Sequence, residues 1–410
     1  MVRILGSIIH HRNEFIQKLR NIINIINGKE VSSTIPQTIF DKLYLNRLHS
    51  LKIIVPSQYT VPSGILNEAR KILSAWTKSE KIIIVPDKLE VTFDEFYTVV
   101  LTVSINLDTF LNDELSTLHP LKEKLIKFNL DLESTFSMAN NRIYNTLLTV
   151  TFYYNDLREN LYWLNHEMNP TPGLEEGITN YISFKSYKVE SSSVKINDKH
   201  RQVIRLGYTF PNFGIDWITI IPSDLNIDNP GIPLDVYIQT HALHRLSERI
   251  DCYPTGSIHY QMFMSFKFPK VFYDNNHNIL IEYRYFGMKA GYFRADISEG
   301  KLVIRTFLFV TNNGTPEGQK LQNITGLQKL DKKYLAIDKL STFMTSDIGN
   351  NEKVRKIFIA AGCQCLLDLY EKSNHISTNS SNHFDADMML KYIGLEKANL
   401  PESIQTGSVL

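Results

Sequence analysis

One histidine and two arginines recur at helical spacing in the segment THALHRLSERI, which begins at Thr240. His241, Arg245 and Arg249 are four residues apart, so a helix would carry all three on one face. Histidine titrates near neutral pH and can act as a general acid or base. Arginine binds phosphate oxygens through paired N–H donors. The pattern therefore predicts a site that binds a phosphodiester and cleaves it without a metal ion or cofactor.

The elements that flank this segment would place the histidine at a helix N-terminus. The apolar run Asp235–Gln239 predicts a strand, and Thr240 is the expected N-cap residue, so His241 would lie in the first helical turn. Free backbone N–H groups at a helix N-terminus favour anions. The opposite face of the helix would be a buried apolar stripe, made of Leu243, Leu246 and Ile250.

The run from His241 to Ile250 resembles the "HAxxRxxER" helix of the barnase–EndoU–colicin–RelE-like superfamily of ribonuclease toxins. In that superfamily the helix precedes a curved antiparallel sheet, and here three predicted strands follow it: ILIEYRYFG, GYFRADI and KLVIRTFLFVT. The resemblance covers about residues 234–312. It implies an RNA-cleaving toxin or defence effector, with His241 and Arg245 at the helix positions of the site. Polar residues of the last strand would complete that site, with Arg305, Thr306 and Thr311 as candidates.

In this hypothesis His241 is the acid or base, Arg245 and Arg249 hold the phosphate, and Arg305 and Thr306 assist from the sheet. Substrate-binding residues are expected at His244, Arg284, Lys289, Tyr292, Arg294 and Thr311. Aromatic residues that alternate with basic ones can stack on bases and contact phosphates. The same alternation is typical of a half-buried strand. Residues 241–310 hold nine basic and six acidic residues, so this segment is modestly basic.

Two other interpretations stay open. The first is a non-catalytic protein that binds RNA or another protein. The second is a structural α+β protein whose His–Arg face is only solvated, with Glu248 in a weak surface pair with His244. The interpretations differ in the surroundings of His241, because an enzyme needs Arg245 and a polar strand residue beside it in one pocket.

The whole-chain composition is that of an ordinary globular protein. The 410 residues carry a formal net charge of +1, with 43% apolar and 21% charged residues. These values exclude a disordered chain and a protein that is basic throughout. The three cysteines predict no disulfide framework, which favours the cytoplasm. No signal peptide is predicted, and no apolar run reaches the roughly 18–20 residues of a membrane helix, so no membrane partner is expected.

We expect an α+β fold in three parts. Residues 1–168 are predicted to form a mainly helical domain, which would serve as a scaffold or bind a protein partner. Residues 174–330 are predicted to form an α+β domain with an antiparallel sheet. Residues 331–410 would add C-terminal helices that pack on it. The boundary is predicted at Asn169–Gly173, where two prolines and a glycine stop a helical pattern that runs from Pro120 to Leu164.

Two further groups have residue types that could bind a metal. Cys363 and Cys365 lie in an apolar run, which favours buried small side chains over a redox or metal pair. A looser cluster has imidazole and carboxylate ligands at a spacing that matches no established metal motif: His375, His383, Asp385 and Asp387.

Overall fold

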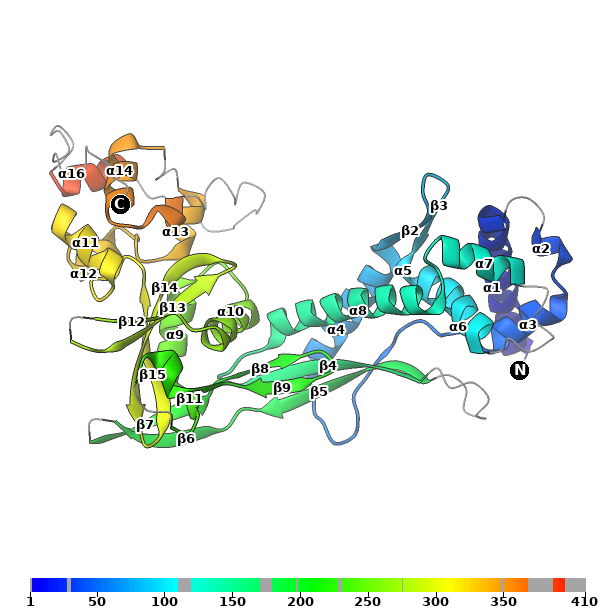
Figure 1. Ribbon diagram of the computed structural model, residues 1–410, viewed down its shortest axis with the longest axis horizontal. Helices are drawn as coiled ribbons and strands as arrows, with labels where there is room; N and C mark the ends of the chain where they lie inside the picture. The colour runs from blue at the N-terminus through cyan, green and yellow to red at the C-terminus, as the bar shows by residue number, and fades with distance from the viewer. Residues whose placement is uncertain are drawn as a thin grey trace. The chain divides into compact units, whose positions relative to one another are not determined.

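The computed structural model divides the chain into two compact units, and each is described by itself (Figure 1). Unit 1 comprises Met1–Val150, Tyr162–Ser186 and Phe210–Gly214, and unit 2 comprises Thr151–Leu161, Tyr187–Thr209 and Ile215–Leu410. The chain thus enters unit 2 before the expected boundary at Asn169–Gly173 and returns to unit 1 twice. The residues that the structure describes are 2–27, 31–109, 119–169, 179–196, 198–227, 231–274, 276–346, 348, 350–367 and 386–394.

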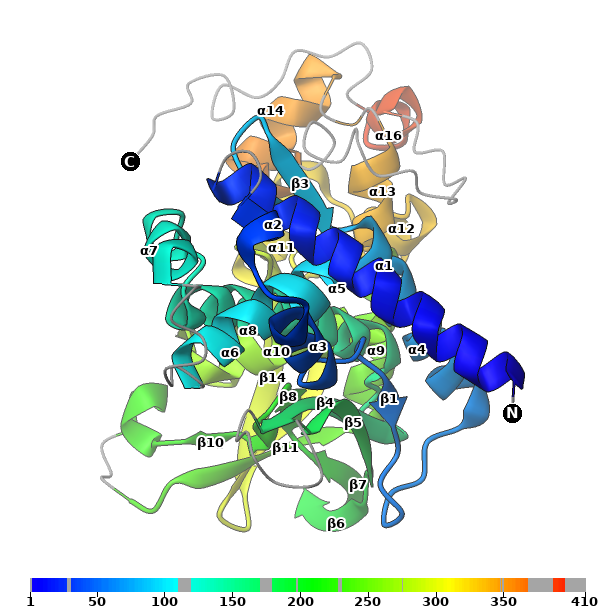
Figure 2. The same ribbon diagram turned by 90° about the vertical axis from the view of Figure 1, so that its right-hand side faces the viewer.

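Unit 1 is mainly helical, as the periodicity of its apolar residues predicts. The helix α1 (Val2–Asn27), drawn in blue in Figure 2, buries Phe15, Leu19 and Ile23 and contacts the elements α2, α3, α7 and η1 of the unit. The remaining helical elements are α2 (Val31–Thr34), α3 (Gln37–Leu45), α4 (Ser63–Ser79), α5 (Phe93–Glu95), the π-helix η1 (Phe96–Leu101), α6 (Thr102–Thr109), α7 (His119–Lys127) and α8 (Leu132–Tyr154).

The end of the N-terminal half corrects one expectation. The predicted helical pattern from Pro120 to Leu164 ends at Tyr154, and β4 (Asn160–Asn169) follows. Within β4 the backbone pairs with β5 (Thr179–Lys188), which also pairs with β1 (Ile53–Ile54). Pairing with β5 therefore decides the conformation of this run, over its helical periodicity. The other strands, β2 (Lys81–Val85) and β3 (Leu89–Thr92), pair with each other.

Unit 2 is built on an eight-stranded sheet in the order β12-β13-β14-β15-β11-β7-β6, with β10 also paired to β11. All neighbouring strands are antiparallel except β11 and β15, which are parallel. The bounds are β6 (Ser191–Ile196), β7 (Lys199–Arg205), β10 (Thr219–Ile220), β11 (Leu234–Gln239), β12 (Val271–Tyr273), β13 (Ile279–Tyr285), β14 (Met288–Ser298) and β15 (Lys301–Phe309). A separate pair consists of β8 (Gly207–Phe210) and β9 (Gly214–Trp217).

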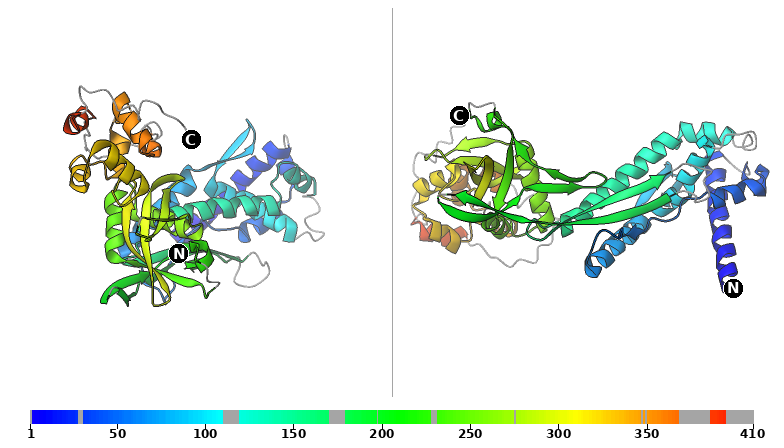
Figure 3. Two further views of the ribbon diagram at one scale, coloured as in Figure 1. Left: turned by 60° about the vertical axis from the view of Figure 1, so that its left-hand side comes forward. Right: turned by 90° about the horizontal axis from the view of Figure 1, so that it is seen from below.

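The predicted strands after His241 are confirmed as the meander β13–β14–β15, drawn in yellow-green and yellow in Figure 3. The turn between β14 and β15 has left-handed backbone at Glu299 (φ 50°) and Gly300 (φ 68°). Two successive left-handed residues suit the right-handed twist of a hairpin, so this turn sets the pairing of the two strands.

Two helices cover one face of this sheet. The predicted helix is α9 (Thr240–Arg249), which packs on β15, and α10 (Thr255–Lys267), which the sequence did not predict, packs on β13. The aromatic rings of Phe266, Tyr283, Phe293 and Phe307 pack between this sheet and α10, with neighbouring ring centroids 5.3–5.5 Å apart, and form the core there.

The C-terminal region is helical as expected, in shorter pieces: α11 (Pro316–Thr325), α12 (Lys329–Tyr334), α13 (Leu340–Thr345), α14 (Glu352–Ala360) and α16 (Ala386–Tyr392). A 3-10 helix, η3 (Pro222–Leu225), precedes β11. The protein is therefore an α+β protein.

The described residues contain no group of three or more His, Cys, Asp or Glu side chains that could hold a metal ion. Cys363 is fully buried, and burial raises the pKa of its thiol to about 12. His375, His383 and Asp385 lie outside the described residues. Within the described ranges, no helix combines the length and the apolar character that a bilayer crossing needs.

Candidate functional site

The helix α9 begins directly where β11 ends, and this junction positions His241. Gln239 is the N-cap residue, because its backbone stays extended (ψ 141°) and pairs with Val203 of β7. Thr240 is already helical, which corrects the expectation that it caps the helix. Leu243 and Leu246 are fully buried and hold the helix against the sheet. The imidazole of His241 therefore lies in the first turn and is exposed.

A β-bulge in β15 positions the polar residues of the sheet. Arg294 pairs with Thr306 and Ala295 pairs with Ile304, so Arg305 is an extra residue between the two pairs. Successive side chains of a strand normally point to opposite faces, and a bulge interrupts this alternation. Arg305 and Thr306 consequently both line the same cavity. This irregularity brings two neighbouring polar side chains to one place.

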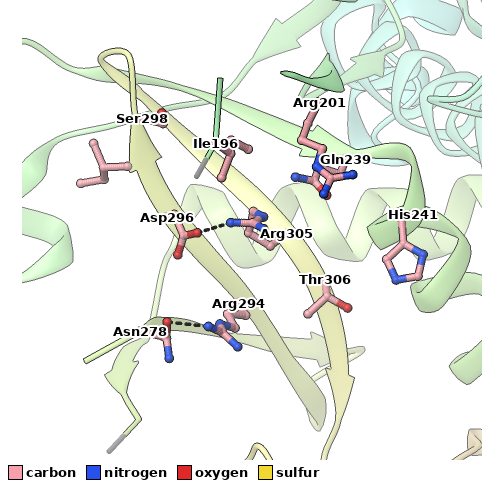
Figure 4. Close-up of a pocket in the computed structure, with 11 residues that line it drawn as sticks. Ile196, Arg201, Gln239, His241, Asn278, Arg294, Asp296, Ser298, Arg305 and Thr306 are labelled. Atoms are coloured by element: carbon pink, nitrogen blue, oxygen red, sulfur yellow. Dashed lines mark hydrogen bonds and ion pairs between the residues drawn. The ribbon is translucent and has the colours of Figure 1, made fainter. Parts of the chain in front are cut away.

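Side chains from α9 and from six strands or their ends meet in a cavity of about 640 Å³, here named the β14–β15 pocket (Figure 4). Its size is in the usual range for ligand pockets, about 300–1,000 Å³. In Figure 4, Arg305 and Thr306 project from β15, Arg294 and Asp296 from β14, and His241 from α9. The lining residues are Ile196, Arg201, Gln239, His241, Asn278, Arg294, Asp296, Ile297, Ser298, Arg305 and Thr306.

Hydrogen bonds hold two of the guanidinium groups in this pocket. Arg305 Nη1 donates to Asp296 Oδ2 over 2.5 Å, and Arg294 Nη2 donates to Asn278 Oδ1 over 2.7 Å. Two buried donors of the pocket, Arg305 Nε and Gln239 Nε2, have no hydrogen-bond partner among the described residues. An unsatisfied buried donor costs about 1–3 kcal/mol. A ligand with oxygen acceptors would remove that cost.

The charge of the pocket favours an anion. Arg201, Arg294 and Arg305 supply three positive charges, and Asp296 is the single carboxylate among the described lining residues. Arg201 is exposed and forms no ion pair with any residue in the described ranges. Guanidinium groups match the geometry of phosphate oxygens, and an imidazole beside them can transfer a proton. The arrangement has the groups needed to bind a phosphodiester and to accept or donate a proton next to it.

The structure brings together four of the predicted site residues, His241, Arg294, Arg305 and Thr306. Two others of the predicted catalytic set lie elsewhere. Arg249 forms an ion pair with Asp338, and its side chain is only 14% exposed. Arg245 pairs with Glu248 over 2.7 Å, so Glu248 does not serve His244 as expected.

The other predicted binding residues do not line this pocket either. His244 is exposed on α9. Arg284 bonds to Glu282 over 2.5 Å, and Lys289 bonds to Glu317 over 2.5 Å. The hydroxyl of Tyr292 donates to Glu317, and Thr311 donates to the carbonyl of Ile337 over 2.8 Å; both residues are buried. The alternation of aromatic and basic residues here belongs to half-buried strands.

Sequence reasoning missed several residues of the pocket, namely Arg201, Gln239, Asn278, Asp296 and Ser298. The motif RAD contains a usable signal, since Arg294 and Asp296 are two residues apart and therefore share a face of β14. Arg201 carries no such signal, because β7 reaches the site only through its pairing with β11.

Comparison with known protein families, with curated proteins and with solved structures finds no match to this chain.

Proposed function

We propose that the β14–β15 pocket binds RNA and cleaves one of its phosphodiester bonds by a metal-independent mechanism. The observation that supports this most is the meeting of His241, Arg294, Arg305 and Thr306, from one helix and two strands, in a single pocket. The charged groups of the pocket are mainly nitrogen cations, and the carboxylate of Asp296 forms an ion pair with Arg305. A divalent cation such as Mg²⁺ needs several oxygen ligands, which makes this donor set a poor one for it.

In the proposed reaction, the ribose 2′-oxygen attacks the adjacent phosphorus. His241 accepts the proton of the 2′-hydroxyl as the new O–P bond forms. Arg294 and Arg305 stabilise the negative charge that develops on the phosphorane oxygens. The bond to the 5′-oxygen then breaks, and the leaving oxygen takes a proton from water. The products are a 2′,3′-cyclic phosphate and a 5′-hydroxyl. The hydroxide left by the water then takes the proton of the His241 imidazolium, so the water and the neutral imidazole are restored.

A non-catalytic RNA-binding protein is the second candidate. His241 is the single imidazole among the described lining residues, and the carboxylate of Asp296 is ion-paired with Arg305. The described lining therefore has no second free group for proton transfer, which favours binding without cleavage. Such a protein would bind the same phosphates and leave them intact.

The test is cleavage of a single-stranded oligoribonucleotide by the full chain in the presence of a chelator. Wild-type protein is expected to give 2′,3′-cyclic phosphate ends. His241→Ala is expected to lower the rate by about 10²–10⁴-fold, the usual contribution of a general acid or base. His10→Ala is the control, because His10 is exposed on α1 in unit 1 and lies outside the pocket, and it is expected to keep the wild-type rate. Binding without cleavage by wild-type protein would favour the second candidate, and equal cleavage by both variants would overturn the role of His241.

A further inference from the structure

A second basic cavity, here named the distal pocket, lies in unit 2 and encloses about 220 Å³. Its described lining has five basic side chains and one carboxylate, Asp338, whose charge is matched by its ion pair with Arg249. The lining residues are Arg245, Arg249, Asn312, Asn313, Lys329, Leu330, Lys332, Lys333 and Asp338. The β14–β15 pocket does not share any of them.

The same two segments line both pockets in the same order. His241 and Thr306 line the β14–β15 pocket, whereas Arg245 and Asn312, which come later in α9 and after β15, line the distal pocket. The helix α9 packs on β15. With a rise of about 1.5 Å per residue, the helix spans about 6 Å from His241 to Arg245 and about 12 Å from His241 to Arg249. At about 3.4 Å per nucleotide, the spacing along one strand of a stacked duplex, these distances correspond to about two to four phosphates.

A buried cation adds to the positive charge of the distal pocket. The side chain of Lys332 is almost fully buried, and its ammonium donates to the carbonyls of Thr311 and Gly318 over 2.8 and 2.9 Å and to the amide oxygen of Asn313. Within the described ranges it forms no ion pair with a carboxylate. Its burial lowers its pKa to about 8, so it still carries its charge at neutral pH. The pocket thus holds a fixed positive charge that an anion would compensate.

Two exposed lysines that line the distal pocket can bind such an anion. Lys329 and Lys333 are exposed and belong to the short helix α12. No described residue forms an ion pair with either of them. Arg245 is 39% exposed and has Glu248 as an exposed partner, a type of pair worth only about 0–1 kcal/mol, so it can exchange that partner for a phosphate.

We propose that the distal pocket is a phosphate-binding subsite for single-stranded RNA, about two to four nucleotides from the bond that is cleaved. This inference rests on the proposed function of the β14–β15 pocket. The substrate is then a polynucleotide that follows α9 from one pocket to the other. A dinucleotide fills the β14–β15 pocket alone and gains nothing from the distal pocket.

The test compares binding of a dinucleotide and of an unstructured eight-nucleotide RNA, measured by fluorescence anisotropy with the cleavage-silent His241→Ala chain. Adding Lys329→Ala and Lys333→Ala is expected to weaken binding of the eight-nucleotide RNA by about tenfold at low salt. The affinity for the dinucleotide is expected to stay unchanged. The slope of log K against log[salt] should fall by roughly 1.4, about 0.7 for each phosphate contact on a single strand. The control adds Lys320→Ala and Lys356→Ala, which remove the same charge from exposed positions outside both pockets, and is expected to change binding less than twofold.

Each outcome separates the two proposals. The distal subsite would be overturned if the α12 substitutions and the control substitutions weakened RNA binding equally. Equal affinity of the His241→Ala chain, with all its lysines in place, for the dinucleotide and the longer RNA would overturn it too. A selective loss with the α12 pair, in a protein that does not cleave RNA, would keep the subsite and overturn the cleavage proposal. Absence of RNA binding would overturn both. Single-stranded DNA of the same length should bind the distal pocket and resist cleavage, because it lacks the 2′-hydroxyl.

Discussion

Arg305 and Asp296 form an ion pair on one face of the β14–β15 ladder, with 2.5 Å between Nη1 and Oδ2. Arg305 is the bulged residue of β15, so its backbone has no partner in the register of the ladder. Asp296 orients this guanidinium, while the Nε of Arg305 stays without a partner among the described residues. The aspartate therefore acts as a positioning residue for a cation that faces the pocket.

Replacing Asp296 with asparagine separates binding from turnover. Asp296→Asn removes the one negative charge of the described lining, so RNA is expected to bind two- to fivefold more tightly, a change of roughly 0.5–1 kcal/mol. The turnover number should fall, because Arg305 loses the partner that orients it. Steady-state kinetics would show KM and kcat decreasing together. An unchanged kcat would contradict the positioning role.

Arg305 itself is expected to matter for turnover more than for folding. Arg305→Ala should lower kcat by about 10²–10³-fold, the typical cost of removing a donor to a developing oxyanion. Arg305→Lys should recover only part of this loss, because an ammonium cannot contact Asp296 and a phosphate through separate, fixed donors. Circular dichroism serves as the check on folding. Wild-type turnover in a folded Arg305→Ala chain would remove Arg305 from the mechanism.

Arg249 is expected to act on stability, in contrast to the phosphate contact that its spacing suggested. Its partner Asp338 is 11% exposed at the side chain, and burial raises the pKa of this carboxyl. Arg249→Ala would leave that carboxylate buried and unpaired, so the free energy of unfolding should fall by about 3 kcal/mol. Urea denaturation measures the loss, and Asp338→Asn in the same chain should restore part of it. Arg245→Ala, which removes an exposed pair, should change stability by less than about 1 kcal/mol.

Stability should also depend on pH through His259. This side chain is fully buried in α10, its Nδ1 accepts the backbone N–H of Leu157 over 3.3 Å, and burial lowers its pKa to about 4. Between about pH 6.5 and pH 4, His259 therefore binds a proton in the unfolded chain and stays neutral in the folded chain. Stability is expected to fall between about pH 6.5 and pH 4, by roughly 3 kcal/mol in total, and to lose no more from this residue below pH 4.

The variant His259→Gln keeps an acceptor and does not titrate in this range. Urea denaturation across pH 4–7 should show a shallower loss of stability for His259→Gln than for wild-type protein. His244→Gln is the control, because His244 is exposed, and it should follow the wild-type curve. Parallel curves for wild type and His259→Gln would show that His259 does not control the pH dependence.

Local patterns in the sequence predicted much of this protein, including the helix α9 and the strands β13, β14 and β15. These elements carry strong local signals, since apolar periodicity and turn residues act over a few neighbours along the chain. Where local signals conflicted, prediction failed. The first half of β4 lies in the predicted helical pattern from Pro120 to Leu164, and its pairing with β5 overrode that preference. The helix α10 was missed for a related reason: nine of its residues are buried, so its pattern has little polar contrast.

The candidate site shows the same division. The sequence alone placed His241 at the start of a helix and Arg305 and Thr306 on a strand, because residue type and local spacing are sufficient for that. Only the tertiary structure decided which side chains share a pocket. The bulge at Arg305 turned two neighbouring residues to one face, and the pairing of β11 with β7 and β15 brought Arg201 and His241 to the same cavity. Arg249 and Arg245 form ion pairs with Asp338 and Glu248 and do not line the β14–β15 pocket. Spacing along one helix cannot report such partners, because they come from strand register and from side chains distant in the sequence.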